Sequence, residues 1–127
     1  MPPTRSVEPI GLEIKVDVAE RDACAWLVGV LDLYTAPRLR EAMVEVLAGR
    51  NDPFVVTLDL SDLDFIDSSG LGVLIAVLKR LRHIGGNLVL RAPSRSLCRL
   101  LDLTGLDKVF TLEQPSAAAA DSEGVSA

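Results

Sequence analysis

The chain has 127 residues, of which 49% are hydrophobic and 24% charged, and its formal net charge is −5. This length corresponds to one domain, and the composition excludes intrinsically disordered, collagen-like and disulfide-framework proteins. The negative charge argues against a nucleic-acid partner, because non-specific binding of that kind requires basic surface to neutralise phosphates.

The sequence also lacks features of membrane insertion and secretion. No apolar run approaches the about 20 residues that span a bilayer, and the first residues lack the apolar core of a signal peptide. We therefore expect a cytoplasmic protein that does not contact a membrane. Cys24 and Cys98 lie far apart within apolar stretches, which predicts buried, reduced thiols.

In chain order, residues 1–10 predict a flexible tail, 11–112 a folded domain and 113–127 a disordered acidic and alanine-rich tail. The first predicted strand has alternating apolar residues: Leu12, Ile14, Val16 and Val18. Residues 23–30 are almost continuously apolar, which predicts a strand covered on both faces. Thr35 then predicts the cap of a helix, with Pro37 in its first turn and Gly49 at its end.

The second half of the domain alternates strands and helices. Residues 54–60 predict a strand, and a helix follows from Asp67 until Gly85 stops it. Residues 87–91 and 109–112 predict two further short strands. Between them lies a third helix capped by Ser94, whose predicted buried residues are Leu97, Leu100, Leu101 and Leu103.

This order of elements predicts the fold class. Helices that alternate with strands imply parallel strands joined by right-handed crossovers. The two adjacent strands at the start imply an antiparallel hairpin. The sequence therefore predicts one small α/β domain with a mixed, mostly parallel sheet opened by that hairpin.

Enzymatic chemistry is poorly supported. The only histidine, His83, lies near the far end of the helix that begins at Ser68 and Ser69, about 20 Å along its axis, so no catalytic triad can form. Gly70 and Gly72 match neither a phosphate-binding loop nor a dinucleotide fingerprint, and we interpret them as allowing close packing of the helix start on the sheet.

Metal binding is also poorly supported. Four acidic residues precede the helix, but their spacing in the sequence is not that of an EF-hand loop: Asp59, Asp62, Asp64 and Asp67. We expect no metal, no cofactor and no catalytic residue.

A serine that is itself modified fits this segment better. A phosphate at a helix N-terminus is tolerated by the helix dipole and by free N–H groups. It would add about −1.5 to −2 charges beside Asp64 and Asp67. Phosphorylation would therefore change a docking surface without unfolding the domain.

The same segment resembles a known signature. The run from Phe65 to Leu74, with Asp59-Leu60-Ser61 before it, is similar to the STAS domain of bacterial anti-anti-sigma factors. Further matches follow in the family's order and extend the resemblance over residues 11–112: Gly29-x-Leu31-Asp32, Ala36-Pro37-Arg38-Leu39 and Leu100-Leu101-x-Leu103-Thr104-Gly105-Leu106.

The resemblance implies a regulatory cycle and a STAS-like fold. In this family an anti-sigma factor of the histidine-kinase-like ATPase type phosphorylates one serine of the antagonist. The unphosphorylated antagonist binds that kinase and frees a sigma factor, and a metal-dependent serine phosphatase resets the cycle. The phosphorylated position matches Ser69, with Ser68 as the alternative.

The resemblance also implies a partner-binding surface at Asp32, Asp67, Ser68, Gly70 and Leu71. Asp32 matches an acid near the phosphorylation site, and the alternative is a capping or turn acid before Thr35. The helix cap could be Ser68 or Asp67, and Leu71 could be an exposed contact or a core residue.

Two further points stay open. Val30 departs from the polar residue that the family often has there, which puts one partner contact in doubt. A scaffold or accessory subunit of a stressosome-like or lipid-transport complex is the alternative function.

Overall fold

The computed structural model describes residues 11–114. In chain order its elements are β1 (Leu12–Val18), β2 (Asp22–Leu31), α1 (Ala36–Leu47), β3 (Val55–Ile66), α2 (Ser68–His83), β4 (Asn87–Arg91), α3 (Arg95–Thr104), the 3-10 helix η2 (Leu106–Lys108) and β5 (Thr111–Glu113). The last strand thus includes Glu113, one residue beyond the predicted domain. Gln114 follows it outside any helix or strand, and the remaining predicted tail residues, 1–10 and 115–127, lie outside the described residues.

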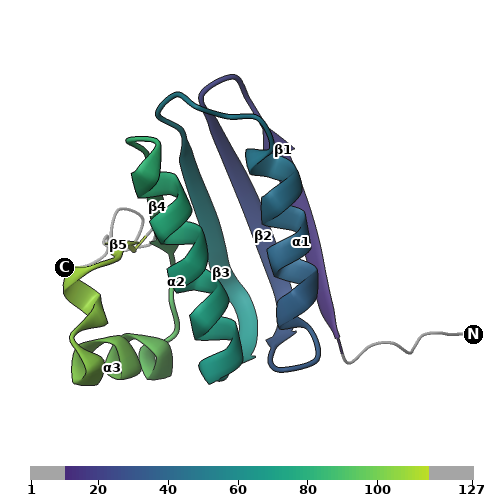
Figure 1. Ribbon diagram of the computed structural model, residues 1–127. Coiled ribbons are helices and arrows are strands. Elements are labelled where there is room, and N and C mark those ends of the chain that lie inside the picture. Colours follow the sequence, from purple (N-terminus) through teal and green to yellow (C-terminus); the bar gives the residue numbers. More distant parts are fainter. Residues whose placement is uncertain (1–10, 115–127) are drawn as a thin grey trace, which may run out of the picture.

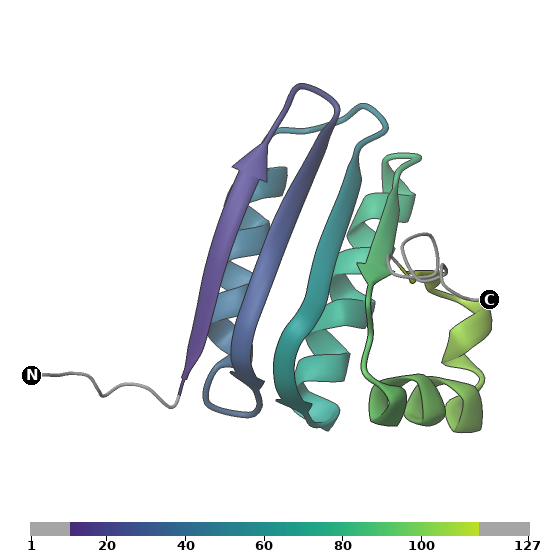
Figure 2. The ribbon, with the colours of Figure 1, turned by 180° about the vertical axis from the view of Figure 1, so that it is seen from behind.

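The strands form one five-stranded sheet in the order β1-β2-β3-β4-β5. β1 pairs antiparallel with β2, and every later neighbour is parallel. Helices α1 and α2 cover one face of the sheet, and the strands are seen uncovered from behind (Figures 1 and 2). The predicted small α/β fold with an opening hairpin is confirmed.

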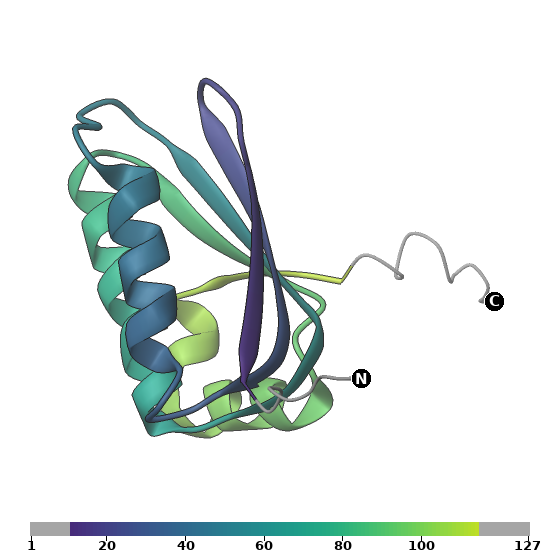
Figure 3. The ribbon, with the colours of Figure 1, turned by 90° about the vertical axis from the view of Figure 1, so that its right-hand side faces the viewer.

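The core lies between the sheet and the two long helices (Figure 3). Along β3, Val56, Leu58 and Leu60 point to this layer and are buried, as the two-residue period of a strand requires. The stripe of α2 that includes Leu74 and Leu78 packs on them. One apolar face on each element therefore accounts for the layered packing.

The predicted double coverage of β2 is wrong. Its burial alternates, and Trp26 keeps 37% of its surface exposed while Ala25 and Leu27 on either side are buried. The outward side chains lie on the sheet face away from α1 and α2, where apolar character in the sequence does not mean burial. The antiparallel hairpin thus gives β2 one covered face, which is typical of mixed sheets.

Three local predictions also need correction. β3 runs twelve residues to Ile66, whereas the predicted strand ended at residue 60. Thr35 precedes α1 but its side chain does not cap the helix, because its hydroxyl donates to the carbonyl of Val30 at 2.8 Å. Leu103 is 76% exposed, since it falls on the outer side of α3.

Both cysteines are free but only partly buried, which corrects the prediction of fully buried thiols. Cys24 lies on the open face of the sheet, where it accepts a hydrogen bond from Arg91. In the described part of the chain, no helix has the length and apolar character to cross a membrane.

Candidate functional site

The start of α2 is built around Asp67. Its Oδ1 accepts hydrogen bonds from the backbone N–H groups of Ser69 at 2.8 Å and Gly70 at 3.1 Å. Asp67 has extended backbone dihedrals and is therefore the N-cap, which decides between the two predicted candidates. Ser68 becomes the first helical residue and is exposed, whereas Ser69 in the second position is half-buried.

Gly70 brings this helix start onto the sheet. A Cβ at this position would lie 2.6 Å from Leu31 Cγ and 2.8 Å from the Leu31 carbonyl oxygen. It would also lie 2.9 Å from Ile66 Cγ1. At Gly72, by contrast, an added Cβ would meet nothing within 4 Å. Close packing, predicted for both glycines, is therefore found at Gly70 alone.

The turn after β2 lies beside the same helix start. The N–H of Asp67 donates to the carbonyl of Leu31 at 3.2 Å, so the ends of β2 and β3 are joined directly. The Oδ1 atom of Asp32 accepts from the N–H groups of Tyr34 at 2.9 Å and Thr35 at 3.1 Å. Asp32 thus has the hydrogen bonds of a turn acid while lying one residue from the contact with Asp67.

The five predicted partner-binding residues differ in accessibility. Ser68 is exposed, and Asp32 and Asp67 are half-buried. Gly70 and Leu71 are buried in the layer between α2 and the sheet, so the core interpretation of Leu71 is correct. The buried side of the helix start, which carries Gly70 and Leu71, fixes the position of α2 on the sheet. The side that a partner could contact carries the serine hydroxyls and the carboxylates of Asp32 and Asp67.

Three exposed apolar residues at this end of the sheet were missed as site residues. Leu33 and Tyr34 occupy the turn after β2, and Tyr34 is 84% exposed. Phe65, near the end of β3, is exposed and lies opposite Val30 in the β2–β3 register. The sequence does contain a signal for this surface, because Leu33 and Tyr34 form an apolar pair in a turn, where residues are usually polar.

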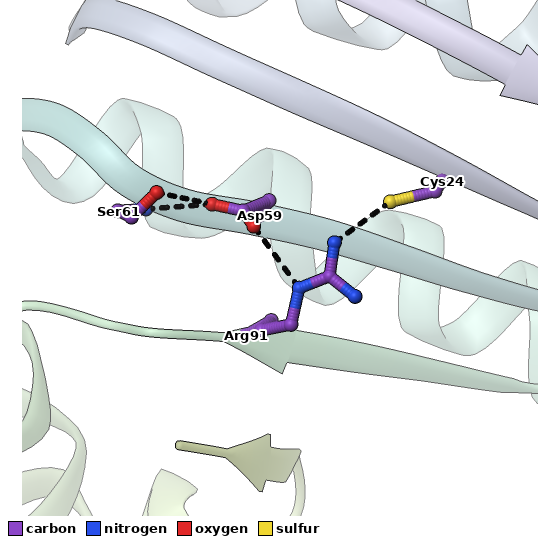
Figure 4. Close-up of polar contacts among 4 residues, drawn as sticks. All are labelled: Cys24, Asp59, Ser61 and Arg91. Carbon is purple, nitrogen blue, oxygen red and sulfur yellow. Dashed lines mark hydrogen bonds and ion pairs between the residues drawn. The ribbon is translucent and has the colours of Figure 1, made fainter. Parts of the chain in front are cut away.

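The other titratable groups of interest lie elsewhere. On the open face, the Nε atom of Arg91 is 3.0 Å from Asp59 Oδ2, and its Nη2 atom is 3.1 Å from Cys24 Sγ (Figure 4). Burial alone would raise the pKa of Asp59, but hydrogen bonds from Ser61 and Arg91 outweigh it and lower that pKa below its ordinary value. Burial raises the pKa of the Cys24 thiol, which Arg91 only partly offsets.

The histidine and the potential metal ligands of the described residues do not gather at the helix start. Among residues 11–114, no cluster of three or more His, Cys, Asp or Glu side chains could hold a metal ion. His83 is exposed at the opposite end of α2 from Ser69. The start of α2 instead brings together two serine hydroxyls and the carboxylates of Asp32 and Asp67. Beside them lies an apolar rim, which is made of the exposed residues Leu33, Tyr34 and Phe65.

A five-stranded mixed sheet with a serine pair at the start of its second helix defines a class of domain. The family model described as "STAS domain" matches residues 13–119, and the chain belongs to this family. The anti-sigma-B factor antagonist of Listeria monocytogenes is 34% identical over 105 residues, which cover 80% of this chain and 90% of the relative. That of Bacillus subtilis is 36% identical over 107 residues, covering 83% and 95%.

Solved structures agree with this assignment. A putative anti-sigma factor antagonist from Thermotoga maritima has the same fold, with a TM-score of 0.72, 24% identity and coverage of 86% of this chain and 92% of that one. An anti-sigma factor antagonist from Mycobacterium paratuberculosis superposes with a TM-score of 0.66 at 33% identity, covering 83% and 87%.

Proposed function

We propose that this protein is an anti-sigma factor antagonist that is switched by phosphorylation of Ser69. In the unphosphorylated state it binds an anti-sigma factor of the histidine-kinase-like ATPase type and thereby frees a sigma factor. The same partner phosphorylates Ser69, and a metal-dependent serine phosphatase removes the phosphate. The observation that carries the proposal is that Ser69 lies in the first turn of α2, at the end of the sheet where Leu33, Tyr34 and Phe65 are exposed. The names of the similar antagonists support it.

The surroundings of Ser69 explain how a phosphate would switch binding. The side chain sits in the first turn of α2, where the helix dipole favours negative charge. Asp67 already accepts the N–H groups of Ser69 and Gly70, so a phosphate would meet a carboxylate as well as a helix end. The dipole preserves the fold, whereas about −1.5 to −2 added charges alter the surface.

The partner would contact both charge and apolar area. Leu33, Tyr34 and Phe65 present exposed side chains at the end of the sheet that carries Asp32 and Ser68. Aromatic residues in such positions often carry much of the binding energy of an interface. Gly70 and Leu71 act indirectly, because their burial holds the helix start in place.

The decisive experiment combines phosphorylation with binding. Incubation with the cognate kinase and ATP should add one phosphate, which mass spectrometry should locate on Ser69. Ser69→Ala should bind the kinase and remain unmodified, and Ser69→Asp should stay folded but bind weakly. Ser68→Ala is the matched control and should be phosphorylated. Modification of Ser68 in the wild type, or full binding by Ser69→Asp, would refute the switch.

The apolar rim has a separate test. Tyr34→Ala should weaken kinase binding by about tenfold or more, as expected for an exposed aromatic contact at an interface. Leu103→Ala, which truncates a comparably exposed side chain on α3, should leave binding unchanged. Equal affinities for the two variants would remove Tyr34 from the proposed interface.

A further inference from the structure

Within residues 11–114, the edge strand β1 has one side that pairs with no other strand. It is the first strand in the sheet order and pairs only with β2 among residues 11–114, and Figure 2 shows it at the outer margin of the sheet. Its seven residues continue without a proline or an irregularity in register. A regular edge of this length is a template for pairing with another strand.

The β1–β2 register identifies which backbone groups are free. Gly11 and Ala19 hydrogen-bond to β2 residues at the two ends of the hairpin. Hydrogen-bonded pairs alternate along an antiparallel ladder, so the odd-numbered residues between these two point their N–H and C=O groups toward β2. The corresponding groups of Ile14, Val16 and Val18 therefore point away from the sheet.

The side chains of these three residues are also incompletely covered. They lie on the helix side of the sheet, yet Val16 is 39% and Val18 48% exposed. An open groove of about 580 Å³ lies between Ile14 and α1, and its lining combines the exposed Val44 with charged residues of α1: Arg38, Glu41 and Glu45. Apolar surface and unpaired backbone thus occur together along one edge.

The charges on the other side of β1 are self-complementary. Lys15 and Asp17 are exposed and are separated by Val16. If a second β1 lies antiparallel with Val16 opposite Val16, each Lys15 faces Asp17 of the second copy. The same register pairs Ile14 with Val18. The hydrogen bonds between the two copies would then use the backbone groups of Ile14, Val16 and Val18 that point away from the sheet. A shift that centres the pairing on Lys15 or Asp17 would place like charges opposite each other. Pairing centred on Ile14 would set Lys15 against Glu13, but it would leave the exposed Val18 without a partner in β1.

We propose that β1 is a homodimerisation strand that pairs antiparallel with β1 of a second copy about Val16, which continues the sheet across two molecules. Lysine on an edge strand ordinarily discourages such pairing. Here Asp17 neutralises it when Val16 faces Val16, so the charges of the edge are compatible with a second copy in that register. This surface runs along the side of the sheet and does not depend on the proposed role of Ser69.

Sedimentation equilibrium of the 127-residue chain tests the proposal. The wild type should associate to a dimer as concentration rises. Val16→Pro should stay monomeric, because proline removes an N–H that points to the free edge and leaves the bonds to β2 intact. Circular dichroism should show that it remains folded. A monomeric wild type at every concentration, or a folded Val16→Pro that dimerises as the wild type does, would overturn the proposal.

Charge reversal tests the register. Lys15→Glu should raise the dimer dissociation constant by about tenfold, because two symmetric pairs become repulsive. Adding Asp17→Lys to that variant should restore the wild-type constant. Lys79→Glu, which makes the same charge change on the exposed side of α2, is the control and should have no effect. Equal dissociation constants for the single and double variants would overturn the pairing about Val16.

Discussion

Two glycines in the first turns of α2 should respond to alanine with opposite signs. In an ordinary helix interior, alanine is more favourable than glycine by about 0.5–1 kcal/mol. Gly72→Ala should show this gain, because an added Cβ meets nothing within 4 Å. Gly70→Ala should instead destabilise the protein, because the Cβ would lie 2.8 Å from the carbonyl oxygen of Leu31.

The magnitude at Gly70 follows from what must move. The side chains of Leu31 and Ile66 can rotate only within a packed core, and the Leu31 carbonyl belongs to β2. Overpacking of this kind costs about 1–3 kcal/mol, of which the helix propensity of alanine recovers less than one. Because the added Cβ would lie under 3.0 Å from three atoms, the cost falls in the upper part of this range. We therefore expect a net loss of about 1–2 kcal/mol, or a melting temperature lower by roughly 3–12 °C.

Urea unfolding followed by circular dichroism measures both variants against the wild type. The expected order of unfolding free energy is Gly72→Ala above wild type and Gly70→Ala below it. If Gly70→Ala were as stable as the wild type, the close approach between α2 and β2 would not be a constraint. The proposed positioning of Ser69 by that contact would then fail as well.

Two further predictions concern side chains that stabilise the fold. Asp67→Ala should lower the unfolding free energy by about 1 kcal/mol, because the N–H of Ser69 loses its cap, whereas Asp67→Asn should retain most of it; equal losses would refute the capping role. Because the pKa of Asp59 is lower in the folded state, its contacts with Arg91 and Ser61 should stabilise the protein fully above the unfolded value of about 3.9. That contribution should disappear as pH falls toward the folded pKa, so the unfolding free energy of Asp59→Asn should change less than the wild type's between pH 7 and pH 3.

Local patterns in the sequence were sufficient for the order and type of the elements. The start of α2 could be predicted because a cap residue, a serine pair and a new apolar period occur within a few residues of Asp67. The end of α2 at Gly85 and the cap of α3 at Ser94 depend on equally local signals. Each of these features is decided by groups that are neighbours along the chain.

Burial could not be predicted in the same way. The apolar run of β2 is compatible with two covered faces or one, and only the placement of α1 and α2 on a single side leaves Trp26 exposed. The extension of β3 to Ile66 likewise depends on β2 as its pairing partner, because residues 61–66 carry a mixed pattern of their own. Both outcomes are decided by neighbouring elements rather than by the segment itself.

The sequence by itself thus determined a small α/β domain with a serine pair at the start of its second helix, because helix periodicity and capping act over a few residues. Only the tertiary structure decided what surrounds that pair. The parallel β2–β3 register joins Leu31 to Asp67 and so brings Asp32 and Tyr34 to the same end of the sheet. Residues that far apart in sequence meet only when the strands pair, and no local pattern encodes that pairing.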